Sequence, residues 1–130
     1  MMKKKVEVTQ EMVAEKLLPA LTKIKELRQE LAKYNDQLDV LAGEVAELHK
    51  KHADGSAAIR RQLENAEFND TLLVQQLTEN TVIEIELDRK VAERIDIIGR
   101  VECIERDLEQ LIDEVATGNI LGIEEEEGYW

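Results

Sequence analysis

The sequence predicts an all-α protein: an elongated antiparallel helical hairpin or coiled coil that forms a helical bundle on self-association. Of its 130 residues, 35% are charged and only 3% are aromatic, and proline occurs once. This composition is typical of long helices and coiled coils. Apolar residues also recur at steps of three and four over long stretches of the chain, which is the spacing of one helical face.

The N-terminal end of the chain is polar, and we expect residues 1–9 to form an arm. Thr9 has the side chain of a helix N-cap, and Glu11 would interact favourably with the positive end of the helix dipole. We expect a short helix over 10–17 that kinks or restarts at Pro19, because the residue before a proline avoids helical geometry.

The clearest heptad pattern lies in the first helical arm, residues 10–52. Its apolar residues alternate between steps of three and four without a gap until His52, as the inner positions of a coiled coil do. We therefore expect this stripe to mediate self-association. Its members are Ile24, Leu27, Leu31, Tyr34, Leu38, Leu41, Val45 and Leu48.

The segment "HADGS" predicts the turn of the hairpin, at residues 53–56. Asp-Gly is a turn signal, and Ser56 is a suitable N-cap for the next helix. The alternative is an uninterrupted helix that tolerates Gly55, and the heptad phase does continue beyond it at Ile59 and Leu73. We favour the turn.

The second helical arm is predicted over residues 57–117, with a break somewhere between 65 and 81. Asp70 is a candidate cap for a fresh start, Thr81 and Glu84 have the spacing of a capping box, and Gly118 is placed to end the helix. The inner heptad positions along which two helices pack are called the seam below. Asn80 either forms a polar layer that sets the register of the seam or lies outside the seam. The residues of this arm predicted to mediate self-association are Leu87, Val91, Ile98, Val101, Leu108, Leu111 and Val115. Two apolar rows lie side by side on its last helix, and the second of them comprises Leu87, Val91, Ile95 and Ile98.

The expected arms differ in length, with 43 residues over 10–52 and 61 over 57–117. A continuous second arm would overhang the first by about 27 Å, and its apolar stripe would need cover. We therefore expect a homodimer or larger assembly that forms a four-helix bundle.

No constellation of residues points to catalysis, and we expect no enzymatic activity, cofactor or metal. His49 and His52 share a helical face, but we interpret them as histidines at a helix C-terminus that interact with its dipole. The single cysteine, Cys103, falls within an apolar helical pattern and is expected to behave as a small hydrophobic residue.

The charge is unevenly distributed along the chain. Residues 1–60 carry 11 basic and 10 acidic side chains, whereas residues 61–130 carry 6 and 19. Such an acidic half repels nucleic acid, so we expect no direct nucleic-acid binding and favour a protein partner with a basic surface. Neither a signal peptide nor a membrane-spanning segment is apparent, which predicts no membrane association and a cytoplasmic location, or the host cytoplasm for a viral protein.

Residues 118–130 are expected to form an acidic flexible tail. Four glutamates precede two aromatic residues, Tyr129 and Trp130. This pattern resembles the acidic C-terminal tips of single-stranded-DNA-binding proteins, which implies recruitment of a partner with a basic-rimmed apolar pocket. The candidate partner-binding residues are Glu124, Glu125, Glu126, Glu127, Tyr129 and Trp130. The alternative is a passive tail.

The function expected from these patterns is that of a non-enzymatic coiled-coil assembly protein, scaffold or adaptor, acting through self-association and partner binding. The alternative is an acidic decoy that occupies the basic nucleic-acid-binding surface of another protein.

Overall fold

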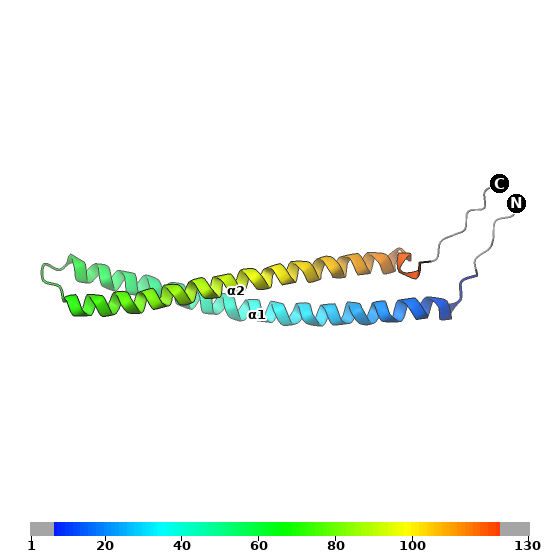
Figure 1. Cartoon of the computed structure of the whole chain (residues 1–130), viewed down its shortest axis with the longest axis horizontal. Coiled ribbons are helices and arrows are strands. Elements are labelled where there is room, and N and C mark those ends of the chain that lie inside the picture. Colours follow the sequence, from blue (N-terminus) through cyan, green and yellow to red (C-terminus); the bar gives the residue numbers. More distant parts are fainter. Residues whose placement is uncertain (1–6, 123–130) are drawn as a thin grey trace, which may run out of the picture. The chain divides into compact units, whose positions relative to one another are not determined.

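The computed structural model describes residues 7–122, in which two long helices pack against each other as a hairpin. Helix α1 spans Gln10–Glu64, helix α2 spans Asp70–Ala116, and a 3-10 turn, η1, spans Asn119–Leu121 (Figure 1). No strand occurs among the described residues. The predicted all-α hairpin is therefore confirmed.

The chain divides into two compact units, each of which contains a stretch of both helices. Among the described residues, the terminal unit comprises 7–33 and 101–122, and the loop unit comprises 34–100. Each unit has its own buried apolar residues. Those of the terminal unit are Ala20, Ile24, Leu27, Val101 and Ile104, and those of the loop unit are Leu41, Val45, Leu87 and Ile97.

Helix α1 begins at the predicted cap but is not interrupted where expected. The Thr9 hydroxyl oxygen accepts a hydrogen bond from the Met12 amide at 3.2 Å, which confirms the cap. The expected end at residue 17 is wrong, because α1 continues through Pro19. Pro19 is exposed, so its ring does not disturb the packing between the two helices. The cost to the helix is one backbone hydrogen bond, because proline has no amide hydrogen. The cap and the rest of the first arm hold the segment helical.

The predicted turn at residues 53–56 is also wrong, because these residues lie inside α1. The chain turns instead at residues 65–69, within the region where a break was expected. Buried and half-buried positions of α1 keep heptad spacing through the Asp-Gly-Ser segment to Ile59 and Gln62. Continuing the helix therefore extends the seam, and that gain outweighs a local turn preference. The helices are 55 and 47 residues long, so the large overhang inferred from the sequence disappears.

Helix α2 starts one residue after its cap, which is Asn69 rather than Asp70. Asn69 Oδ1 accepts a hydrogen bond from the Leu72 amide at 3.0 Å, and Asp70 is the first helical residue. The Thr81 capping box is not formed, because Thr81 lies inside α2. The predicted stop is confirmed: α2 ends at Ala116, and Gly118 has a φ of 79°, a left-handed conformation that glycine adopts readily.

Candidate docking face of the loop unit

The seam of the loop unit contains one polar layer, in which Asn80 of α2 lies against Gly55 of α1. Asn80 is 6% exposed, the only polar residue classed as buried among the described residues. Its Nδ2 donates a hydrogen bond to the Ser56 hydroxyl at 3.1 Å. A Cβ at Gly55 would collide with Asn80 Oδ1 and lie 2.9 Å from Asn80 Cγ. Gly55 thus provides space for the asparagine, which explains a glycine inside a long helix.

Two amide oxygens of this region have no hydrogen-bond partner among the described residues. They are Asn80 Oδ1 and Gln76 Oε1, and both are buried. An unsatisfied buried polar atom costs about 1–3 kcal/mol. The polar layer therefore contributes less stability than an apolar layer of the same size. Its physical role is to set register, because Asn80 fits only opposite a residue without a side chain.

Two contacts across the seam define one edge of the hairpin. Ser56, beside the α1 seam, bonds to Asn80 in the α2 seam. Glu84, beside the α2 seam, has its Oε2 3.8 Å from Nε2 of His52 in the α1 seam. Ser56 and Glu84 each lie beside the seam of their own helix and contact a seam residue of the other helix. The line of residues that contains Ser56 on α1 and the line that contains Glu84 on α2 therefore lie along the same edge of the hairpin.

The α2 row on this edge is rich in large apolar side chains. Val74, Leu77 and Ile95 are 67%, 59% and 65% exposed. The hydroxyl of Thr81 donates to the Leu77 backbone oxygen at 2.7 Å, so this polar atom is already satisfied and the surface of the row is less polar than the sequence suggests. In order along the helix, the row is Val74, Leu77, Thr81, Glu84, Asp88, Val91, Ile95 and Ile98.

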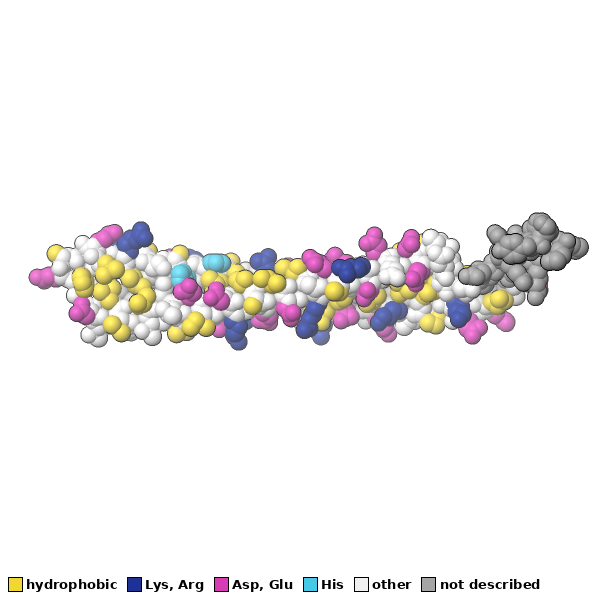
Figure 2. Space-filling view, turned by 45° about the horizontal axis from the view of Figure 1, so that its top comes forward, with side chains coloured by type: hydrophobic (Ala, Val, Ile, Leu, Met, Phe, Trp, Pro, Cys, Tyr) yellow, Lys and Arg dark blue, Asp and Glu magenta, His cyan; other side chains and the backbone are white. Residues whose placement is uncertain are grey.

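The α1 row on the same edge consists mainly of small residues. Its spacing of three and four matches that of the α2 row, so the two rows lie side by side along the seam. We name the two rows together the docking face. The α1 row is Ala42, Ala46, His49, Ala53, Ser56, Arg60 and Leu63. Figure 2 shows this side of the molecule, with hydrophobic side chains on either side of the two histidines.

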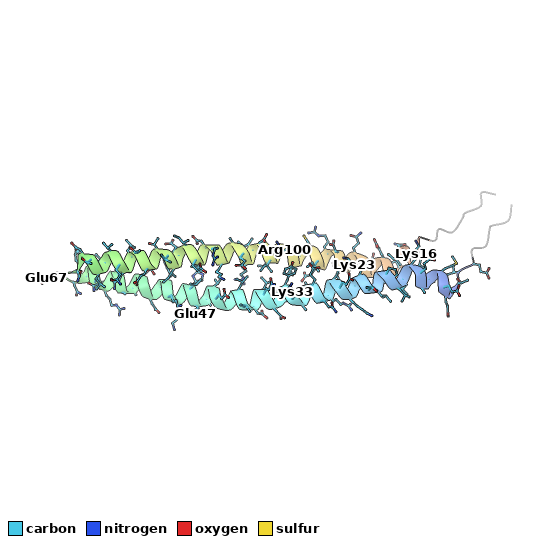
Figure 3. All side chains as sticks on the ribbon, turned by 60° about the horizontal axis from the view of Figure 1, so that its bottom comes forward. Lys16, Lys23, Lys33, Glu47, Glu67 and Arg100 are labelled. Atoms are coloured by element: carbon cyan, nitrogen blue, oxygen red, sulfur yellow. The ribbon has the colours of Figure 1, made fainter. Side chains whose placement is uncertain are left out.

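The opposite edge of the loop unit is charged. Lys90 Nζ lies 2.7 Å from Glu44 Oε2, and this hydrogen bond raises the pKa of Lys90 above its usual value. Lys51 pairs with Glu47 at 3.4 Å, and Glu47 projects from α1 into solvent (Figure 3). A shallow hollow of about 260 Å³ between these side chains also includes Glu86. The two edges therefore differ in chemistry: exposed apolar side chains and small residues prevail on one, and ion pairs prevail on the other.

Most residues predicted to mediate self-association lie in the seam within one chain. Leu41 and Val45 are buried against α2, and Leu87 is buried against α1. Ile24, Leu27 and Val101 are buried in the terminal unit, and the half-buried members are Leu31, Tyr34, Leu38, Leu48, Val91, Leu108, Leu111 and Val115. Only Val91 and Ile98 belong to the docking face. A direct role of the seam in self-association stays a prediction.

The remaining candidate residues are placed as follows. Residues 124–130, with the predicted partner-binding side chains, lie outside the described residues. His52 lies in the interior of α1, so the interpretation as a helix-terminal histidine is wrong. Cys103 is exposed rather than packed among apolar residues. Within residues 7–122, no group of three or more His, Cys, Asp or Glu side chains is placed to hold a metal ion.

Sequence reasoning found part of the docking face and missed the rest. The second row recognised on α2 included Val91, Ile95 and Ile98. Val74 and Leu77 were missed because residues 65–81 were expected to be broken, although they continue the same three-four spacing. The alanines of α1 carry a weak signal, because alanine is common on any helix.

The terminal unit has an apolar surface of its own. The first turns of α1 form an open hollow of about 400 Å³ whose lining includes Val8, Val13, Leu17 and Leu18. Leu18 is 60% exposed. Nothing in the geometry of this hollow selects a particular ligand.

Comparisons with known proteins give no relative: no family model matches the chain, and no curated protein or solved structure is significantly similar to it. None of the described helices combines the length and the apolar character needed to cross a bilayer.

Proposed function

We propose that this protein is a non-enzymatic assembly protein, a scaffold or adaptor, that works by burying its docking face against another helical surface. The observation that supports the proposal is the exposure of large apolar residues along one edge, with Ile95 and Val74 about two-thirds exposed. Aligned apolar side chains left in water at helical spacing are typical of a surface that a further helix covers.

Self-association is the first part of the proposed function. At micromolar concentration, light scattering should return at least twice the 14.9 kDa mass of the chain. Ile95→Asp should raise the dissociation constant at least about a hundredfold, because burying an unpaired carboxylate costs several kcal/mol. Ile95 is exposed in the single chain, so this substitution should leave the hairpin folded.

Val40→Asp is the matched control for this experiment. Val40 is 61% exposed against 65% for Ile95, and both residues are β-branched residues inside helices of the loop unit. Val40 belongs to neither row of the docking face and lies one heptad before Glu47 of the charged edge. A monomeric wild-type protein, or equal effects of the two substitutions, would overturn the proposed self-association.

Partner capture by the acidic C-terminal residues is the second part of the proposed function. Glu124 to Glu127 would steer the chain toward a basic surface, and Tyr129 and Trp130 would anchor it. A protein partner with a basic rim around an apolar pocket fits this chemistry. Its support is the sequence pattern alone.

A further inference from the structure

We infer that the docking face of the loop unit binds the same face of a second copy of this chain, with the α2 row of each copy lying on the α1 row of the other and both interhelical loops at the same end. This inference rests on the proposed function and specifies its partner and geometry. Three observations support it separately: the side-chain sizes of the two rows, the charges that they carry, and the area of the face.

The two rows differ in side-chain size in a complementary way. The α2 row presents Val91 and Ile95, whereas the α1 row presents Ala42 and Ala46. Helices pack by fitting the ridges of one into the grooves of the other, so large side chains fit best over small ones. Turning a second copy so that its α2 row meets the α1 row places Val91 and Ile95 beside Ala42 and Ala46 in both helix pairs.

The register of the hairpin places these residues at matching levels. Arg100 contacts Tyr34, and Lys90 contacts Glu44. Each pair lies at one level along the hairpin, so a step of ten residues back along α2 matches a step of ten residues forward along α1. By interpolation, Ala42 lies level with the interval between Val91 and Ile95. In the proposed dimer, Ala42 of one copy therefore lies between Val91 and Ile95 of the other. This is the arrangement of a small residue beneath two larger ones.

Charge favours the same arrangement. The acidic residues of the α2 row are Glu84 and Asp88, and His49 of the α1 row lies level with the interval between them. In the proposed dimer His49 of each copy faces this acidic pair of the other copy. With the loops at opposite ends, the α2 rows would face each other, and Glu84 and Asp88 would meet like charges.

The available area matches what a stable dimer requires. The α2 row of the docking face runs from Val74 to Ile98 and spans about 36 Å at 1.5 Å per residue, and two helices side by side are about 20 Å wide. The docking face therefore offers about 700 Å² per copy, close to the roughly 800 Å² per partner of a standard stable interface. A second copy is thus sufficient to cover the face.

Mixed single-cysteine variants test the geometry of the dimer. Cys103→Ser serves as background, and Ile95→Cys chains of full length are mixed with Ala42→Cys chains that carry a mass tag. Because each chain has one thiol, every disulfide formed on mild oxidation joins two chains. The predominant linked species should join position 95 to position 42. A parallel mixture of Val74→Cys with Ile95→Cys should give no comparable link.

The outcomes separate the inference from the proposed function. A dimer in which positions 74 and 95 link, or in which neither pair links, would contradict the proposed geometry while self-association stands. A monomer by light scattering would overturn both. As a second measurement, Ala42→Phe should abolish dimerisation with unchanged helicity, because its ring fills the space that Val91 and Ile95 would occupy. A dimer of unchanged affinity would contradict the large-on-small contact.

Discussion

Asn80 of α2 occupies the space that a side chain at Gly55 of α1 would fill, and its amide donates a hydrogen bond to Ser56 at 3.1 Å. This pair fixes which residues of the two helices face each other in the loop unit. A slip of one heptad along α1 would place Leu48 or Gln62 near Asn80 in place of Gly55, and either side chain would clash with it.

The first prediction concerns Gly55. Glycine to alanine inside a helix normally stabilises it by about 0.5–1 kcal/mol. Gly43→Ala should do so, because no atom lies within 4 Å of the added Cβ. Gly55→Ala should instead destabilise the protein by about 1–2 kcal/mol, because the Cβ displaces Asn80. Urea unfolding measures both changes.

A double substitution isolates the contact. With Asn80→Ala in place, the Gly55→Ala change should become stabilising again, because the obstructing amide is gone. If Gly55→Ala stabilises the wild-type protein as much as Gly43→Ala does, the close approach of Asn80 to Gly55 does not exist.

The position of the turn gives the second prediction. In the Cys103→Ser background, spin labels at His49→Cys and Leu63→Cys should lie about 21 Å apart, because both positions are on α1. Labels at His49→Cys and Glu84→Cys should lie about 10 Å apart, because they flank the same seam on adjacent helices. Labelled chains are diluted with unlabelled ones so that only distances within a chain contribute. A turn at residues 53–56 would reverse the order of the two distances.

The cap of α2 gives the third prediction. Asn69→Ala should lower the free energy of unfolding by about 1 kcal/mol, because the Leu72 amide loses its acceptor. Asp70→Asn removes only a charge from the first turn and should cost about 0.5 kcal/mol at low salt. Chemical denaturation of both variants checks the assignment; a larger loss for Asp70→Asn would assign the cap to the aspartate instead.

The C-terminal residues give the fourth prediction. Trp130→Ala should weaken binding to the proposed basic-rimmed partner by about 2 kcal/mol, as loss of an interface anchor does. Replacing Glu124 to Glu127 by glutamine should slow association and flatten its dependence on salt. Surface plasmon resonance with the partner separates the two effects. If deleting residues 123–130 shifts the melting temperature and leaves binding unchanged, these residues belong to the protein's own packing.

Much of the fold was predictable from the sequence, because heptad spacing reports a continuous helical face. The run from Ile24 to His52 correctly predicted a continuous helix over that stretch, although not its end at Glu64, and Gly118 correctly predicted the end of α2. The turn was misplaced because Asp-Gly-Ser is a strong signal over a few residues only. The heptad spacing, which continues through Ile59, is the longer-range signal and correctly indicated that the helix continues. Gly55 within that helix is explained only by its contact with Asn80.

The docking face was less accessible to sequence reasoning. A heptad pattern predicts which residues face a neighbouring helix, but it does not say whether that helix belongs to the same chain. The stripe from Ile24 to Leu48 predicts self-association for this reason, and in the structure its buried members Leu41 and Val45 pack against α2 of the same chain. Val74 and Leu77 became candidates only when the structure showed that α1 leaves them uncovered.

Thiol labelling tests most directly whether the docking face becomes buried on self-association. In the Cys103→Ser background, Ile95→Cys and Val40→Cys proteins are labelled with a maleimide at nanomolar and at high micromolar concentration. We predict that labelling at position 95 slows strongly as protein concentration rises, whereas labelling at position 40 does not change. Equal rates at position 95 across the whole concentration range, or equal slowing at both positions, would contradict burial of the docking face.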